Sequence, residues 1–327
     1  MVLFHTQVAT LLYRTGHPWA GNLVHNGYQA VPFFFLLSGF ILAYTYAGKV
    51  ATGSDRLTFW AARIARIWPT YALSLLLSSI PGLTVPPVGN AIAALLMVQA
   101  WNPWLPDLAG TWNYMAWTLS VEAFFYLVFP WLQRWLGGLS RRALLILLGA
   151  VLLLGVSCNI SANGVEAEPY PGIFRFIPLP VIHLPEFIGG AAMGNLFLHS
   201  EGTVNSGAWS YAALGFTLAA LMLPSGPWTS VTLIGFSAFI YCLARQRTLL
   251  VQVLSTRLLV FGGGISYAMY LLQEPVRDWV HPWITNYSRI PWQLAIVPVT
   301  LTALSAVVYL YFEDPARRMI RALLSPQ

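Results

Sequence analysis

Long apolar segments recur along the chain, and they constrain its fold more than any other feature. Residues 28–47 read YQAVPFFFLLSGFILAYTYA, and a helix needs about twenty such residues to cross a hydrocarbon core of about 30 Å. Similar segments follow along the rest of the chain, and only 9% of the residues are charged, against about 25% in soluble domains. Because lipid offers no partner for backbone N–H and C=O groups, this pattern predicts an all-α polytopic membrane protein.

Basic residues between the apolar segments predict how the helices are oriented. Lys49, Arg56, Arg63 and Arg66 form the first basic loop, and the positive-inside rule places such loops in the cytoplasm. Alternation from there predicts about ten transmembrane helices in the cell inner (plasma) membrane, with both termini cytoplasmic. The expected spans cover residues 2–13, 28–47, 68–83, 117–131, 143–159, 178–199, 208–223, 227–244, 258–280 and 292–312.

Two apolar segments are shorter than a span. A crossing at residues 91–101 would move the basic cluster at residues 134–142 to the outside, so we expect a short re-entrant or interfacial helix there. The first apolar segment, residues 2–13, indicates a first helix that is truncated at its N-terminus. A single membrane-embedded domain is expected over residues 1–327.

The charge balance excludes some partners. Seventeen Lys and Arg stand against eleven Asp and Glu, but the basic residues lie in short clusters between apolar segments. Such clusters are typical of topology signals, so no nucleic-acid partner is expected. Cys158 and Cys242 lie far apart and lack any metal-ligand spacing, so no metal site is expected.

Polar residues inside the expected spans are the first candidates for a functional site. Glu122 lies in the apolar segment WTLSVEAFFY, where a carboxylate costs about 2.5 to 3.5 kcal/mol on insertion scales. Counting residues from the helix ends places His5 in the same outer half of the membrane. His5 is either a histidine hydrogen-bonded to a neighbouring helix or a general base that Glu122 orients. Glu186 and Glu274 fall in outer halves too, so one outward-facing cavity would hold all four residues.

Arg63 and Arg66 lie three residues apart at the cytoplasmic end of a span, so they point the same way. They are either ordinary interfacial arginines or a clamp for the phosphate groups of a ligand. Glu313 ends the last span on the same side, at a spacing that allows it to pair with Arg317 along a helix.

Other polar or aromatic residues are expected to line the site or to support it. Ser38 and Gly39 together permit two helices to approach closely. The residues expected at the lining of the site are Ser38, Trp117, Ser120, Glu186, Tyr267, Gln273, Glu274 and Glu313.

Together these motifs resemble the integral-membrane acyltransferase 3 family, bacterial enzymes that acylate sugars of exopolysaccharides, O-antigens, peptidoglycan and secondary metabolites. The resemblance spans nearly the whole chain, and its segments follow the family's order. They are LFH around His5, VPFFFLLSGFILA at 31–43, RIARIWPTY at 63–71, WTLSVEAFFYLVFP at 117–130, LPEFIGGAAMG at 184–194, ISYAMYLLQEPV at 265–276 and FEDPARR at 312–318.

The resemblance implies roles for several residues. His5 matches the family's histidine, taken as the catalytic base or acyl-accepting group, and Glu122 matches the glutamate of a motif similar to WSLSVE. Arg63 and Arg66 match the pair that handles the acyl-CoA donor. Glu313 and Pro315 match an E-x-P element, and the family has a ten-helix core. An arginine upstream of the histidine has no counterpart here, and Gln273 stands where many relatives have histidine.

The function expected from these features is transfer of an acyl group, and the acyl group expected is acetyl. The donor would be cytoplasmic acyl-CoA, with no permanently bound cofactor. The acceptor would be a hydroxyl of a carbohydrate or lipid-linked glycan at the outer side of the bilayer. A transporter or proton-coupled permease would equally explain the intramembrane carboxylates, and an inactive truncated homologue would explain the missing arginine.

Overall fold

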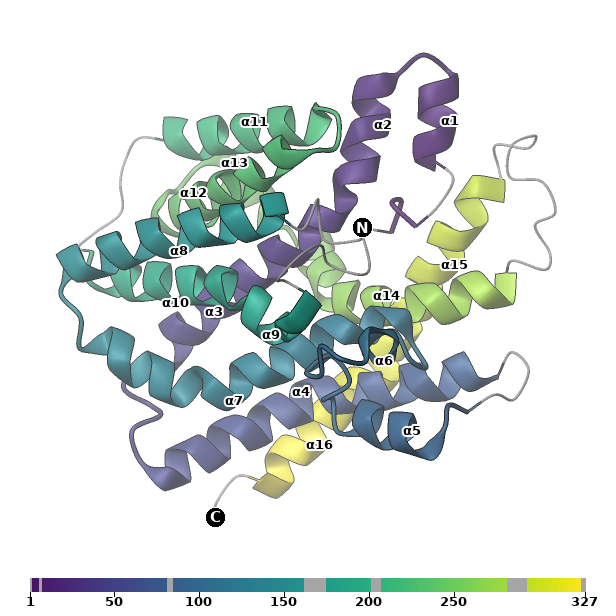
Figure 1. Ribbon diagram of the computed structural model, residues 1–327, viewed down its shortest axis with the longest axis horizontal. Helices are drawn as coiled ribbons and strands as arrows, with labels where there is room; N and C mark the ends of the chain where they lie inside the picture. Colours follow the sequence, from purple (N-terminus) through teal and green to yellow (C-terminus); the bar gives the residue numbers. More distant parts are fainter. Residues whose placement is uncertain are drawn as a thin grey trace.

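The computed structural model describes residues 2–5, 8–80, 85–161, 175–200, 207–280 and 293–324 (Figure 1). Within these ranges the chain forms helices and no strand, which confirms the all-α prediction. The longer helices are α3 (Ala30–Tyr46), α4 (Gly53–Ser79), α7 (Trp117–Gly137), α8 (Arg141–Ser161), α10 (Leu184–Leu198), α11 (Ala208–Met222), α12 (Thr232–Arg245), α14 (Arg257–Val280), α15 (Gln293–Val308) and α16 (Asp314–Leu324). The shorter ones are α1 (Val8–Arg14), α2 (Pro18–His25), α5 (Val88–Leu95), α6 (Pro106–Ala109), α9 (Leu179–Ile182) and α13 (Leu249–Leu254).

Five helical segments among the described residues are long and apolar enough to cross a membrane, so the chain is a multi-pass membrane protein. They are Pro18–Tyr46, Tyr114–Gly137, Arg141–Cys158, Trp228–Arg245 and Ala295–Ile320. Helices also occupy the described parts of the other expected spans apart from the first, although the number of ten crossings stays a prediction. The segment expected as a short re-entrant or interfacial helix, residues 91–101, overlaps α5, which has only eight residues and ends at Leu95.

The N-terminal segment differs from the expected first span. Residues 2–5 form turns, and α1 has only seven residues before the chain reverses at Gly16, whose φ is +80°. Pro18 then starts α2, where its missing N–H costs nothing. The purple helices at the upper right of Figure 1 show the resulting hairpin. The first long apolar helix therefore begins at Pro18, ten residues before the expected position 28.

Side-chain amides fix this hairpin to a distant helix. Asn26 donates hydrogen bonds to the carbonyl oxygens of Leu221 and Leu223, each at 2.9 Å, and Asn22 donates to that of Met222 at 2.9 Å. These carbonyls belong to the C-terminal end of α11, which has no intrahelical donors for them. The two asparagines of α2 and η1 (Asn26–Gln29) therefore cap α11.

Glycines allow α3 and α10 to pack with their backbones in contact at the centre of the fold. A Cβ on Gly39 would lie 2.2 Å from the carbonyl oxygen of Phe187, and one on Gly190 would lie 1.9 Å from that of Leu36. The expectation that Ser38 and Gly39 mark a close helix approach is thus confirmed.

We expect the substitution Gly190→Ala to lower the thermal unfolding midpoint of the protein in detergent. The added methyl would collide with the Leu36 backbone, and overpacking of this kind costs about 1–3 kcal/mol. Gly149→Ala on α8 is the matched control, because a Cβ there meets nothing within 4 Å and alanine favours a helix by about 1 kcal/mol. Equal midpoints for the two variants would contradict this account of the α3–α10 contact.

Burial separates the central helices from those that face lipid. In the α7 span 61% of the most apolar window is buried inside the protein, against 17% in α8 and 22% in the span that contains α15 and α16. A helix that is apolar on all sides but mostly uncovered within the protein is suited to contact with lipid. Helix α7, which carries Glu122, therefore belongs to the interior of the bundle.

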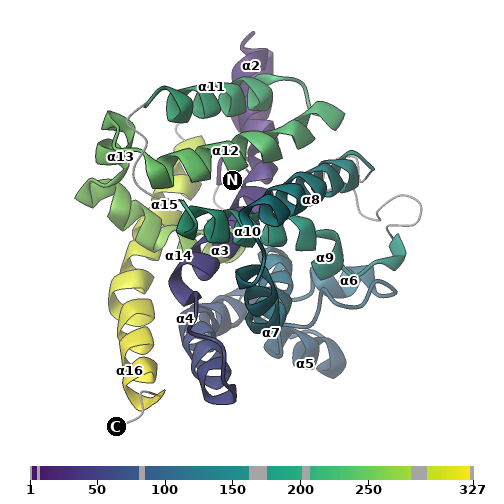
Figure 2. The same cartoon turned by 90° about the vertical axis from the view of Figure 1, so that its left-hand side faces the viewer.

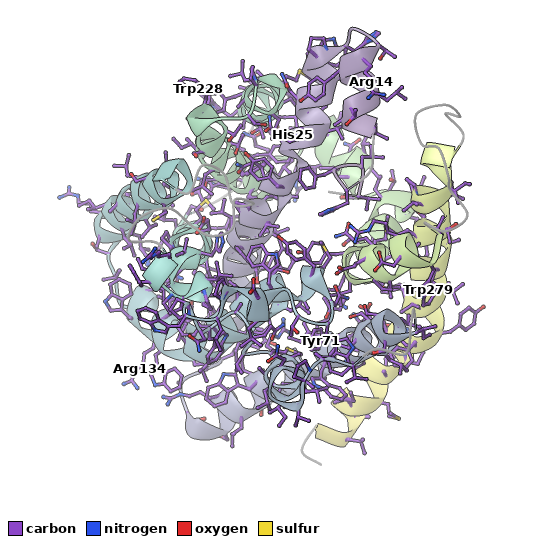
Figure 3. The ribbon with its side chains drawn as sticks, turned by 45° about the vertical axis from the view of Figure 1, so that its right-hand side comes forward. Arg14, His25, Tyr71, Arg134, Trp228 and Trp279 are labelled. Carbon is purple, nitrogen blue, oxygen red and sulfur yellow. The ribbon has the colours of Figure 1, made fainter. Side chains whose placement is uncertain are left out.

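The basic connections gather at one end of the molecule. The α3–α4 and α7–α8 connections and the C-terminus lie toward the lower left of Figure 1, away from the α1–α2 hairpin at the upper right. Figure 3 likewise shows Arg134 and Arg14 at opposite ends. This grouping agrees with the prediction that the basic loops lie on the same side of the membrane. These loops contain Lys49, Arg56, Arg141 and Arg142.

Candidate functional site

Glu122 lies in the interior of α7 and bridges that helix to α3. Only 2% of the residue is exposed. Its Oε1 accepts a hydrogen bond from Ser38 Oγ at 3.1 Å and a second one from the hydroxyl of Tyr126, which is one turn further along α7. These bonds partly replace the hydration that the carboxylate loses on burial.

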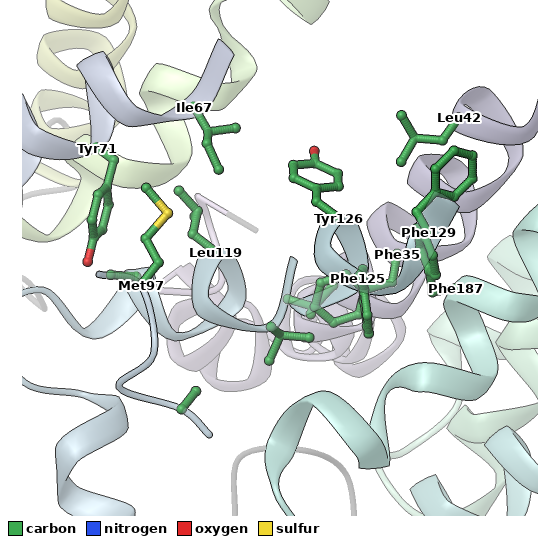
Figure 4. Close-up of a cluster of buried hydrophobic side chains, with 14 of the residues drawn as sticks. Phe35, Leu42, Ile67, Tyr71, Met97, Leu119, Phe125, Tyr126, Phe129 and Phe187 are labelled. Carbon is green, nitrogen blue, oxygen red and sulfur yellow. The ribbon is translucent and has the colours of Figure 1, made fainter. Parts of the chain in front are cut away.

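Aromatic side chains enclose this carboxylate and separate it from lipid. The rings of Phe125 and Phe187 stack at 4.6 Å, and Phe35 meets Phe125 edge-on at 5.2 Å. Figure 4 shows these rings together, with the hydroxyl oxygen of Tyr126 pointing away from Phe125 and Phe187. Glu122 and Tyr126 thus form a hydrogen-bonded polar pair among apolar side chains, where electrostatic interactions are stronger than in water.

Arg63 of α4 lies among aromatic rings close to this pair. Its guanidinium donates a hydrogen bond to Tyr46 Oη at 3.1 Å and lies 5.4 Å from the ring centre of Tyr46 and 5.9 Å from those of Phe59 and Tyr126. Its Nε is buried and has no hydrogen-bond partner in the described part of the chain. Cation–π contacts hold the charge of Arg63 in place without neutralising it.

Arg66, one turn further along α4, is paired with Glu313. The two side chains form an ion pair, and Thr70 Oγ1 donates to the other carboxylate oxygen of Glu313 at 3.3 Å. Figure 2 shows α16, which follows Glu313, running beside α4. The sequence spacing had suggested a pair with Arg317, and that expectation is wrong because Arg317 pairs with Asp314.

Glu313 owes its inward position to a local change in helix geometry. Residues Tyr309–Glu313 form a π-helical turn between α15 and α16. Pro315 follows after Asp314, and its ring would clash with the carbonyl of residue 311 in a regular α-helix. The wider π turn accommodates the proline, and such turns are frequent at functional sites.

Tyr267 connects a third helix, α14, to the same place. Its hydroxyl donates to the carbonyl oxygen of Ile67 at 2.7 Å, and its ring lies 5.3 Å from the guanidinium of Arg66. The structure therefore brings Glu122, Arg63, Arg66, Glu313, Ser38 and Tyr267 into one connected region of α3, α4, α7 and α14 and the α15–α16 junction.

His5 lies apart from that hydrogen-bond network, and the predicted hydrogen bond between His5 and Glu122 is not formed. His5 packs edge-on against Phe4 at 4.8 Å, and its Nε2 is buried without a hydrogen-bond partner among the described residues. The charge that acts most strongly on it is that of Arg277 on α14. The depth estimate assumed a continuous first helix, whereas residues 2–5 form turns and the helical hairpin follows them.

The remaining candidates take other positions. Ser120 Oγ accepts from the backbone N–H of Ala100 at 3.0 Å, so it fixes a turn. Gln273 contacts the sulfur of Met115, and Glu274 accepts from the backbone N–H of Tyr114. These bonds attach α14 to the chain that precedes α7. Trp117 and Glu186 both lie beside His183: the ring centres of Trp117 and His183 are 5.5 Å apart, and Glu186 Oε1 is 3.6 Å from His183 Nδ1.

The sequence reasoning missed several partners in the site. Tyr126 had a local signal, since it follows Glu122 by four residues and shares its helix face. His183 had one as well, three residues before Glu186. Tyr46 and Thr70 had none, because their partners lie on other helices or are distant in the chain.

The arrangement suits a negatively charged ligand on α4 and proton chemistry at His5. Arg63 forms no ion pair with a carboxylate of the described residues, and Arg66 shares its charge with Glu313. No group of three or more His, Cys, Asp and Glu residues in the described part of the chain has the arrangement of a metal site.

Comparison with known proteins places the chain among acyltransferases. The family described as "Acyltransferase domain" matches residues 1–312. The chain is 28% identical to the acyltransferase MdmB of Streptomyces mycarofaciens over 329 residues, covering 90% of this chain and 82% of that protein. It is 25% identical to the O-acetyltransferase OatA of Staphylococcus aureus over 352 residues, covering 95% of this chain and 55% of OatA, so it spans about half the length of that relative. No solved structure matches the chain.

Proposed function

We propose, because the chain belongs to the integral-membrane acyltransferase 3 family and is thus a membrane O-acyltransferase, that it transfers an acetyl group from acetyl-CoA to a carbohydrate hydroxyl. The observation that carries this proposal is the buried region in which Arg63 and Arg66 lie beside the Glu122–Tyr126 pair. A solute carrier would need the buried carboxylates but has no evident use for two clustered guanidinium groups. A CoA thioester carries several phosphate groups, which guanidinium groups bind well.

The donor would enter from the end of α4 that faces the cytoplasm in the topology expected from the basic loops, and its phosphate groups would reach the arginines near the middle of this helix. Arg63 supplies a charge and an Nε–H that have no carboxylate partner among the described residues, so it would form the first phosphate contact. Arg66 has 28% of its side chain exposed and is already paired with Glu313, so it would contribute a second, shared charge.

In the chemical step, His5 would act as the general base. Its imidazole would take the proton of the acceptor hydroxyl as the hydroxyl oxygen attacks the thioester carbonyl. The C–S bond then breaks, the acetyl ester forms, and the CoA sulfur leaves and takes up a proton. Glu122 would act as a positioning residue, since it holds Ser38 of α3 and Tyr126 of α7 beside Arg63. The apolar side chains around this pair would keep water from the thioester.

The acceptor would be a glycan or a lipid-linked glycan at the outer side of the cell inner membrane, with both termini of the protein in the cytoplasm. The names of the relatives support O-acyl and O-acetyl transfer. The rival function is a transporter or proton-coupled permease, which the buried acids alone would equally suit.

Binding of labelled acetyl-CoA to the purified protein separates the two functions. We expect the wild type to bind acetyl-CoA and Arg63→Gln to weaken binding roughly tenfold or more, as loss of a charged hydrogen bond does. This variant leaves the Arg66–Glu313 pair intact.

Arg56→Gln is the matched control for that experiment. Arg56 lies on the same helix and packs on Trp131 at 5.4 Å, as Arg63 packs on its own rings, but it is remote from Glu122 and Glu313. Absence of acetyl-CoA binding in the wild type would overturn the proposed function. Equal affinities of the Arg63 variant and the wild type would remove Arg63 from the donor site.

A further inference from the structure

His183 has an environment that the fold itself does not account for. It lies between α9 and α10, and only 1% of the residue is exposed. Both ring nitrogens are buried, and neither has a hydrogen-bond partner among the described residues. A buried polar atom without a hydrogen-bond partner lowers the stability of a protein. Both ring nitrogens of His183 are therefore available to bond to a ligand.

The surroundings of His183 combine one acid with two aromatic rings. Glu186 lies in the first turn of α10, and its Oε1 is 3.6 Å from His183 Nδ1, which is close but beyond a good hydrogen bond. The rings of Trp117 and Phe35 flank the imidazole with centres at 5.5 Å and 5.3 Å. A few convergent polar atoms between aromatic faces are typical of a small-molecule binding site.

The two helices that hold these aromatic rings also hold the Glu122 network. Phe35 precedes Ser38 by three residues on α3, and Trp117 precedes Glu122 by five residues on α7. At a rise of 1.5 Å per residue, these separations are about 4.5 Å and about 7.5 Å along the helices. His183 therefore contacts two rings whose residues lie within about one and a half turns, along their own helices, of Ser38 and Glu122.

We propose that His183, with Glu186 beside it, binds a hydroxyl group on the sugar ring of the acyl acceptor. An imidazole in its neutral form presents one donor and one acceptor, which is the complement of a hydroxyl group. Trp117, which is partly exposed, would pack against the apolar face of the sugar ring. This assignment rests on the proposed acyl transfer and makes His183 a residue of the acceptor site rather than of the donor site.

The test compares His183→Phe with His183→Gln in cells that carry the protein. The readouts are alkali-released acetate from surface carbohydrate, the affinity of the purified protein for acetyl-CoA, and the thermal unfolding midpoint. We expect His183→Phe to lower carbohydrate acetate roughly tenfold or more, as loss of a buried hydrogen bond to the acceptor does. Acetyl-CoA affinity should be unchanged. The unfolding midpoint should be unchanged or higher, because the phenyl ring removes two unpaired nitrogens.

His183→Gln should recover part of the acetylation, since its amide keeps a donor and an acceptor. His199→Phe is the matched control, because His199 lies at the other end of α10 and its Nδ1 is paired with the Asn195 carbonyl at 2.9 Å. If His183→Phe does not accumulate in the membrane, His183→Leu replaces it with the same expectations.

Wild-type acetylation in His183→Phe would overturn the inference and leave the proposed function standing. A lower unfolding midpoint in His183→Phe together with weaker acetyl-CoA binding would also overturn it, since that result marks a structural histidine or one that holds only a buried water. A wild type that neither binds acetyl-CoA nor acetylates carbohydrate would overturn the proposed function and this inference with it.

Discussion

Replacing His5 by alanine should lower acetyl transfer by about 10²- to 10⁴-fold, the usual contribution of a general base. The effect should fall on the chemical step, because the structure shows no hydrogen bond from His5 to the Glu122 network or to the arginines of α4. The abundance of the protein and its affinity for acetyl-CoA should therefore stay at wild-type values. The rate of CoA release with acceptor present, compared with acetyl-CoA binding, measures the two effects separately.

His25→Ala is the control for that experiment. His25 packs against the same Phe4 ring, with ring centres 6.0 Å apart, against 4.8 Å for His5. Loss of activity in both variants would indicate that the Phe4 contact matters rather than the imidazole of His5. Wild-type activity in His5→Ala would contradict the assignment of His5 as the base.

Replacing Arg66 by methionine should destabilise the protein by about 3–5 kcal/mol, because a buried carboxylate loses its counter-charge. The side chain of Glu313 is 2% exposed, and after the change only Thr70 would remain as its partner. Glu313→Met should cost less, since the side chain of Arg66 is 28% exposed and can reach water. Resistance of the purified protein to unfolding in a denaturing detergent measures the difference.

The double variant Arg66→Met with Glu313→Met should recover most of the loss, because no buried charge remains unpaired. Arg318→Met is the control, since Arg318 pairs with Asp314 at 2.6 Å but has 79% of its side chain exposed, and exposed pairs contribute less than about 1 kcal/mol. If the effects of the two single substitutions simply added in the double variant, Arg66 and Glu313 would not stabilise each other as the structure implies.

The fold class and the choice of Glu122 as a candidate site residue followed from local properties of the sequence. Long apolar segments predicted the membrane helices, and the cost of a charge in lipid marked Glu122 as a candidate for a functional site, which the structure places in the interior of the bundle. Gly39 was correctly expected at a close helix approach, because small residues are the ones that allow backbones to touch.

The choice of partners between helices could not be read from spacing. Glu313 lies four residues before Arg317, which predicts a pair along a regular helix, but the π turn before Pro315 directs Glu313 toward Arg66 of α4. The expected contact between His5 and Glu122 is not formed, for a related reason. The depth of a residue along a helix gives no information about which neighbouring helix its side chain faces.

Transfer of labelled acetyl from acetyl-CoA into carbohydrate by inside-out membrane vesicles is the decisive measurement of the proposed acyl transfer, because the donor then has access to the cytoplasmic side. We expect labelled, alkali-labile acetate in the carbohydrate fraction with the wild-type protein. His5→Ala should lower this label by about 10²-fold or more at equal protein abundance. Absence of carbohydrate label with the wild type, or equal label with His5→Ala, would contradict the proposed reaction.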